Sequence, residues 1–123
     1  MTKIEIEFIF NSSERILYNR LSTASGLSEW FADDVTINDN IFTFIWEGVE
    51  EQAKLISKKD SNYVRFKWLE SEDDTYFEFK IQTHDITKEI ALIVTDFAID
   101  EEKQEVIELW ETQINELKHI LGA

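Results

Sequence analysis

The first residues of the chain alternate between apolar and polar side chains. Within residues 2–10, every second position is apolar, and these positions are Ile4, Ile6, Phe8 and Phe10. Successive side chains of a strand point to opposite faces, so the pattern predicts a strand with one buried face.

The spacing then changes to that of helices. The polar residues 11–13 can cap a helix that continues to Leu21, and Thr23 or Ser25 can cap a second, short helix. Three apolar residues of the second helix share a face at i, i+3 and i+4, namely Leu27, Trp30 and Phe31.

From Asp33 to Phe97 the period is two again. A strand is expected to begin at Val35, and further strands are expected at 42–46, 49–55, 64–68, 77–81 and 90–97. The last of these is almost continuously apolar, which predicts that both of its faces are covered along part of its length.

A long helix is expected at the C-terminal end. Asp100 is a good N-cap, apolar residues recur at helical spacing from Val106 to Leu121, and Gly122 follows as a stop signal. Because each strand has one apolar face and the helix has one apolar stripe, the economical arrangement curls the sheet around the helix. We therefore predict an α+β fold with one domain over residues 1–123: a curved antiparallel sheet of six to seven strands, two short helices after the first strand, and the long helix.

Four segments, in this order, resemble a known superfamily. They are Leu21–Phe31 (LSTASGLSEWF), Phe42–Gly48 (FTFIWEG), Val64–Trp68 (VRFKW), and the C-terminal helix with Leu109–Glu111 (LWE) and Leu121–Gly122. The order is similar to that of the helix-grip fold of START-like domains, the superfamily of Bet v 1 allergens and polyketide cyclases. Within it, the chain most resembles bacterial START-like proteins related to the activator of the heat-shock protein 90 ATPase. The resemblance implies a groove between sheet and helix that often leaves a cavity.

Composition narrows the choice of partners. The chain has 26 acidic and 12 basic residues, a net charge of −14. This balance argues against nucleic acid, whose binders offer Lys and Arg to phosphates, and against anionic membranes. There is no cysteine, no signal-peptide pattern and no membrane-length apolar run, so we expect a cytoplasmic protein.

Aromatic residues gather on one face of the predicted strands. They either fill a core or line a cavity, and apolar walls with a few polar groups are typical of small-molecule sites. The indole N–H groups of the four tryptophans could supply such polar groups. The residues expected to line a ligand site are Trp30, Phe44, Trp46, Phe66, Trp68, Phe77, Leu92, Asp96, Trp110 and Ile114.

Asp96 is the ionisable member of this set. It follows Ile90, Leu92 and Val94 at period two, so its carboxylate could point into the apolar groove and have a raised pKa. Alternatively, the strand has already reached solvent at this point, or Asp96 caps a backbone turn. On the strand face opposite Phe66 and Trp68, Arg65 and Lys67 could pair across strands with Glu78 or with Glu51 and Glu47.

Catalytic signatures are absent from the sequence. His84 and His119 form no metal-binding pair, and no Gly-x-Ser-x-Gly motif occurs. We therefore assign no catalytic residue, metal or cofactor, and favour a non-catalytic domain that binds a small hydrophobic or aromatic ligand. Two alternatives remain: a protein-interaction module, co-chaperone-like, whose acidic stretches Glu70–Asp74 and Glu101–Glu111 dock a basic partner, and an enzyme that uses Asp96. The sequence leaves open whether the chain is a monomer or a homodimer.

Overall fold

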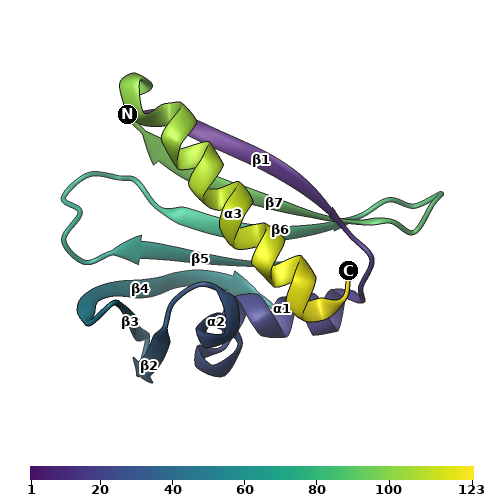
Figure 1. Ribbon diagram of the computed structural model, residues 1–123, viewed down its shortest axis with the longest axis horizontal. Coiled ribbons are helices and arrows are strands. Elements are labelled where there is room, and N and C mark those ends of the chain that lie inside the picture. The colour runs from purple at the N-terminus through teal and green to yellow at the C-terminus, as the bar shows by residue number, and fades with distance from the viewer.

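A seven-stranded antiparallel sheet forms one layer of the protein, and the C-terminal helix lies diagonally across it (Figure 1). The computed structural model describes all residues from Met1 to Ala123. The strands are β1 (Thr2–Phe10), β2 (Asp34–Asn38), β3 (Ile41–Trp46), β4 (Val49–Lys59), β5 (Tyr63–Trp68), β6 (Phe77–Thr83) and β7 (Ile90–Ala98). The helices are α1 (Glu14–Ser22), α2 (Ala24–Trp30), the short 3-10 helix η1 (Asp100–Glu102) and α3 (Lys103–Leu121). This architecture confirms the predicted α+β helix-grip fold.

The strand order is β1-β7-β6-β5-β4-β3-β2, so the first strand pairs with the last. In that pair Ile4 lies opposite Asp96, and both belong to the inner face. Since all neighbours are antiparallel, β3, β5 and β7 run in the same direction and end at the same edge of the sheet. Trp46, Trp68 and Asp96 are therefore brought to one end of the groove between the sheet and α3.

The helix ends follow the predicted capping signals. The Ser13 hydroxyl accepts a hydrogen bond from the Ile16 amide, and the Thr23 hydroxyl accepts one from the Gly26 amide. Gly122 ends α3 in the left-handed conformation, with φ of 67°. These local signals act within one turn, which is why the sequence alone predicts them.

The prediction that Asp100 caps the long helix is wrong. Asp100 begins η1, and α3 starts after Glu102, which makes no side-chain capping hydrogen bond. The carboxylate of Asp100 instead accepts a hydrogen bond from the Thr2 hydroxyl, 2.6 Å away. The nearby β1 strand thus competes for the oxygen that would otherwise cap the helix.

The core lies between the inner face of the sheet and α3. Trp110, Ile114 and Leu117 of α3 are buried against the sheet, as the helical stripe predicts. On the outer face of β7, Ala91 and Thr95 are also buried, which confirms that this strand is covered on both faces along part of its length. Each fully buried large apolar side chain stabilises the fold by roughly 1.5–3 kcal/mol.

The outer face of the central strands carries an ordered charge pair. Arg65 of β5 lies opposite Glu78 of β6, and its Nη2 is 3.0 Å from a Glu78 carboxylate oxygen. The guanidinium also lies 4.0 Å above the ring of Tyr76. Among the predicted cross-strand partners, Arg65 therefore pairs with Glu78.

Among the helices, none is long and apolar enough to cross a membrane.

Candidate ligand-binding site

Asp96 points inward, toward α3. Its Oδ2 accepts a hydrogen bond of 2.9 Å from Nε1 of Trp110, and its Oδ1 accepts one of 2.8 Å from the Phe97 amide. Burial raises the pKa of Asp96, and the hydrogen bonds from Trp110 and Phe97 lower it by a smaller amount. The inward orientation and the direction of the pKa shift agree with the prediction that the Asp96 carboxylate points into the apolar groove. The bond from the Phe97 amide is a local backbone contact, as the alternative prediction of a backbone cap also requires.

The deeper members of the predicted set form a filled aromatic core. Phe66 and Phe77 stack with ring centroids 5.1 Å apart, and Phe44 packs edge-on against Phe31 at 5.0 Å. The fully or almost fully buried members of the predicted set are Trp30, Phe44, Phe66, Phe77, Leu92, Trp110 and Ile114. Protein atoms cover these side chains, so their role in the structure is to form the floor and walls of the groove.

Three of the four indole N–H groups are used inside the protein. Trp110 donates to Asp96, Trp30 donates to the Arg20 carbonyl oxygen at 2.8 Å, and Trp46 donates to the Phe31 carbonyl oxygen at 2.7 Å. The expectation that all four tryptophans offer a free polar group is therefore wrong for these three. Trp68 donates to no protein group, and its side chain is only partly buried.

Trp68 and Asp96 line the same hollow. It has a volume of about 590 Å³ and lies at the end of the sheet where the C-termini of β5 and β7 meet. Pockets for small molecules usually span about 300–1,000 Å³. The lining residues are Met1, Trp68, Glu70, Ser71, Glu72, Asp73, Thr75, Tyr76, Asp96 and Phe97. We refer to this hollow as the β5–β6 mouth.

The loop that forms one wall of the mouth is held by its own hydrogen bonds. Oδ1 of Asp73 accepts bonds from the hydroxyls of Ser71 and Thr75 and from the Thr75 amide, and Lys67 donates to the carbonyl oxygens of Asp73 and Thr75. These hydrogen bonds lower the pKa of Asp73 to about 2. The acidic loop is thus an ordered part of the mouth.

A second hollow lies on the other side of the groove end. Its volume is about 450 Å³, and it is lined by Trp30 and Trp46 of the predicted set together with Gln113 of α3. Nε2 of Gln113 and Nε1 of Trp46 both donate to the carbonyl oxygen of Phe31. Both N–H groups are therefore already used by one carbonyl oxygen.

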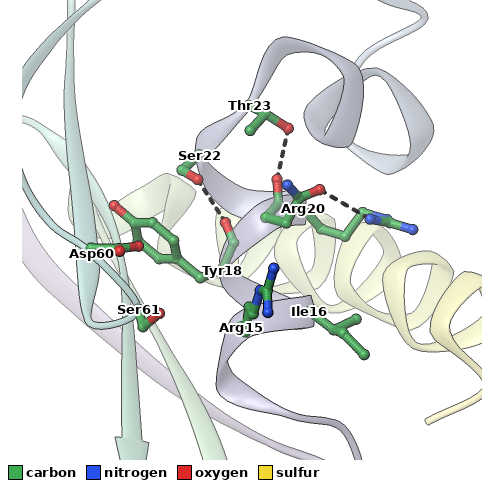
Figure 2. Close-up of a pocket in the computed structure, with 9 residues that line it drawn as sticks. Arg15, Ile16, Tyr18, Arg20, Ser22, Thr23, Asp60 and Ser61 are labelled. Carbon is green, nitrogen blue, oxygen red and sulfur yellow. Dashed lines mark hydrogen bonds between the residues drawn. The ribbon is translucent and has the colours of Figure 1, made fainter.

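A third hollow lies beside α1 (Figure 2). Its volume is about 570 Å³. The hydroxyls of Ser22 and Thr23 donate to main-chain carbonyl oxygens of the preceding turn. Tyr18 faces this hollow, and burial, with the nearby charge of Asp60, raises its pKa. Only two of the nine lining residues are hydrophobic, which does not match an apolar ligand.

Several residues of the β5–β6 mouth are not predicted from the sequence. Tyr76 and Phe97 alternate out of phase with the inward residues Phe77 and Asp96, so period two places them on the outer face. Their rings pack together with centroids 5.1 Å apart and reach the mouth because both lie at strand ends. The signal that could have found them is the position of an acidic loop between two aromatic strands.

Neither histidine belongs to these hollows at the groove end. His84 and His119 are exposed, and no group of three or more His, Asp or Glu side chains is placed to hold a metal ion.

Comparison with known proteins agrees with this geometry. The family model for the START-like superfamily domain matches residues 1–123. The chain therefore belongs to the START-like superfamily. The fold agrees with this assignment, because one sheet packs against one long helix and the two enclose a buried aromatic core.

Solved structures give the same fold. The solution structure of BfR322 from Bacteroides fragilis is 34% identical, with a TM-score of 0.71, and the match covers 98% of this chain and 90% of that one. The Aha1 dimer from Colwellia psychrerythraea is 16% identical, with a TM-score of 0.80 and coverage of 96% and 94%. Protein MLL2253 from Mesorhizobium loti is 12% identical, with a TM-score of 0.77 and coverage of 98% and 97%. The last two likenesses concern the fold alone. No curated protein is significantly similar to the chain.

Proposed function

We propose that this START-like domain is a non-catalytic binder of a small hydrophobic or aromatic ligand, and that the ligand enters at the β5–β6 mouth. The observation that carries the proposal is that one hollow is lined both by the partly buried carboxylate of Asp96 and by Trp68, whose indole N–H has no protein partner. Asp96 offers acceptor oxygens and Trp68 offers a donor, while the Trp68 ring supplies an apolar surface.

The filled core limits how deep a ligand can sit. Phe44, Phe66 and Phe77 have at most 1% of their surface exposed, so a ligand in the observed conformation contacts the mouth and leaves the core packed. The buried residues of the predicted set remain proposed ligand contacts only if the rings move apart when a ligand binds.

An uncharged fluorescent probe tests the proposal. Titration with 1-anilinonaphthalene should give a rise in fluorescence, and Trp68→Ala should weaken binding by about ten-fold or more through the loss of ring contact. The matched control is Ile16→Ala, which removes an exposed apolar side chain from the hollow beside α1 and should leave the affinity unchanged.

Extraction of the purified protein with organic solvent, followed by mass spectrometry, tests the same proposal without a probe. A small aromatic or hydrophobic species that co-purifies with the wild type and not with Trp68→Ala would support it. No co-purified species together with no gain in probe fluorescence would contradict it. Circular dichroism on Trp68→Ala separates loss of the site from loss of the fold.

A second candidate function is protein interaction. The outward side of the first half of α3 carries Glu105, Glu108 and Glu111, all exposed, and Glu101 and Glu102 precede them. Such a surface could dock a basic partner, such as a chaperone, in a co-chaperone-like role. The structural likeness to the Aha1 dimer is the reason for considering this function. A partner captured from the source cell should then dissociate as salt rises from 50 to 500 mM, because exposed charges are screened. Salt-insensitive capture would contradict this alternative.

A further inference from the structure

The β5–β6 mouth is strongly asymmetric in charge. Four of its ten lining residues are acidic, Glu70, Glu72, Asp73 and Asp96, and none is Lys, Arg or His. The lining also includes Met1, which carries the N-terminal amino group, and two basic side chains near the walls are held by other groups. Lys67 donates to the carbonyl oxygens of Asp73 and Thr75, and Arg65 is paired with Glu78. A ligand in the mouth therefore meets four carboxylates, of which Asp73 lies close to Lys67 and Asp96 belongs to no ion pair.

Asp96 is the carboxylate that a ligand would meet at the inner end of the mouth. Both of its hydrogen-bond donors, the Trp110 indole and the Phe97 amide, are neutral, and neither of the two ion pairs of the protein includes it. A partly buried carboxylate without a cationic partner gains more from an incoming positive charge than an exposed one does, because water screens it less. The lack of a cationic partner for Asp96 is thus an observation that does not depend on the acidic loop.

The apolar walls suit a cation as well. Trp68, Tyr76 and Phe97 present aromatic rings to the mouth, and the faces of such rings attract cations. The ring of Tyr76 already receives the guanidinium of Arg65 on one side, at 4.0 Å. Aromatic rings around a carboxylate are a suitable environment for an ammonium group joined to an apolar body.

We infer that the ligand class of this site is an amphipathic amine, an aromatic or alkyl body that carries a protonated amino group, with the ammonium on Asp96 and the apolar body on Trp68. This inference rests on the proposed function of the same mouth. It disfavours anionic ligands such as fatty acids, since a ligand carboxylate would approach four protein carboxylates, and no Lys, Arg or His lines the mouth.

Three ligands with one apolar body test the inference: 4-phenylbutylamine, 4-phenylbutanol and 4-phenylbutyrate. Binding is followed at low ionic strength by the indole N–H signal of Trp68 in proton–nitrogen NMR spectra. The amine should bind about ten-fold or more tightly than the alcohol, and the carboxylate should not shift the signal. Equal binding of amine and alcohol, or binding of the carboxylate, would overturn the inference.

Matched charge variants locate the effect. Asp96→Asn should weaken binding of the amine by about ten-fold and binding of the alcohol by clearly less, because only the amine loses a charge partner. Asp60→Asn makes the same change in net charge beside the α1 hollow and should affect neither ligand. Equal losses in both variants would mean general electrostatic attraction and would overturn the assignment to Asp96.

The same experiment separates failure of the inference from failure of the proposed function. If 1-anilinonaphthalene binds at Trp68 while the amine shows no preference, the mouth is a ligand site of another class. If none of the three phenylbutyl compounds and no neutral probe perturbs Trp68, both the inference and the proposed function are wrong. Circular dichroism confirms that each variant is folded.

Discussion

Nε1 of Trp110 donates a hydrogen bond to Oδ2 of Asp96 across 2.9 Å, and this bond ties α3 to the inner face of β7. The Trp110 ring is held on its other sides by Phe31, with centroids 5.8 Å apart, and by Phe79 at 5.6 Å. The carboxylate at the β5–β6 mouth therefore has a fixed orientation that depends on the long helix.

Replacing Trp110 with Phe should destabilise the protein by about 1.5–3 kcal/mol, because a partly buried carboxylate loses one of its two donors. The pKa of Asp96 should also rise further, since the Trp110 hydrogen bond lowers it. Urea unfolding and NMR titration of the carboxyl carbon measure the two effects. The control is Trp30→Phe, which removes a bond to a neutral carbonyl and should cost about 0.5–1.5 kcal/mol. Unchanged stability and pKa in Trp110→Phe would rule out a role for this bond.

Asp96 should make the protein less stable as pH rises. Its pKa is raised above the usual value of 3.8 in the folded state, so the folded protein holds this proton more tightly than the unfolded chain does. The stabilising contribution is fully present below pH 3.8 and is lost as pH rises through the folded-state pKa. The melting temperature of the wild type minus that of Asp96→Asn should fall over this range. A difference that stays constant with pH would contradict the raised pKa.

Asp73 should behave in the opposite way. Its pKa is lowered from 3.8 to about 2 by hydrogen bonds from Ser71 and Thr75, so its contribution to stability is present above pH 3.8 and is lost as pH falls toward 2. NMR titration should give a pKa of about 2 for the wild type and a higher value in Ser71→Ala. A Ser71→Ala variant with the same pKa for Asp73 would show that the hydroxyl does not act on the carboxylate.

Gly26→Ala should be destabilising although it places a better helix former in α2. A Cβ at this position would lie 2.7 Å from the Cα of Arg20 and even closer to the Asn19 carbonyl oxygen, so α1 and α2 would have to separate. We expect a net cost of about 1–3 kcal/mol from overpacking. Ser25→Ala, at an exposed neighbouring position of the same helix, should change stability by no more than about 0.5 kcal/mol. A stabilised Gly26→Ala would mean that the two helices can move apart freely.

Phe66→Ala should cost about 3–5 kcal/mol, because Phe66 is fully buried among other rings and its removal leaves a cavity. The control is Ile86→Ala, since Ile86 is 96% exposed at the β6–β7 turn and should contribute within about 0.5 kcal/mol. Chemical denaturation measures both. A cost of less than about 1 kcal/mol for Phe66→Ala would indicate a loosely packed interior that could accept a ligand without rearrangement.

The local parts of the fold could be predicted from the sequence because they depend on neighbouring residues. Period-two alternation assigned Phe66 and Phe77 to the inner face, and the caps at Ser13 and Thr23 act within a single turn. The order of elements then led to the helix-grip architecture, since the apolar faces of sheet and helix must cover each other.

The candidate site needed the tertiary structure. Asp96 is 14 residues from Trp110 and lies in a different strand from Trp68, and only the strand order brings the three to one edge of the sheet. The same contacts decided which indole N–H groups are already used and diverted Asp100 from its expected cap to Thr2. The sequence by itself determined which side chains face inward, because that depends on backbone periodicity. The structure decided which polar atoms stay free for a ligand, because hydrogen-bond partners are set by distances between segments far apart in the chain.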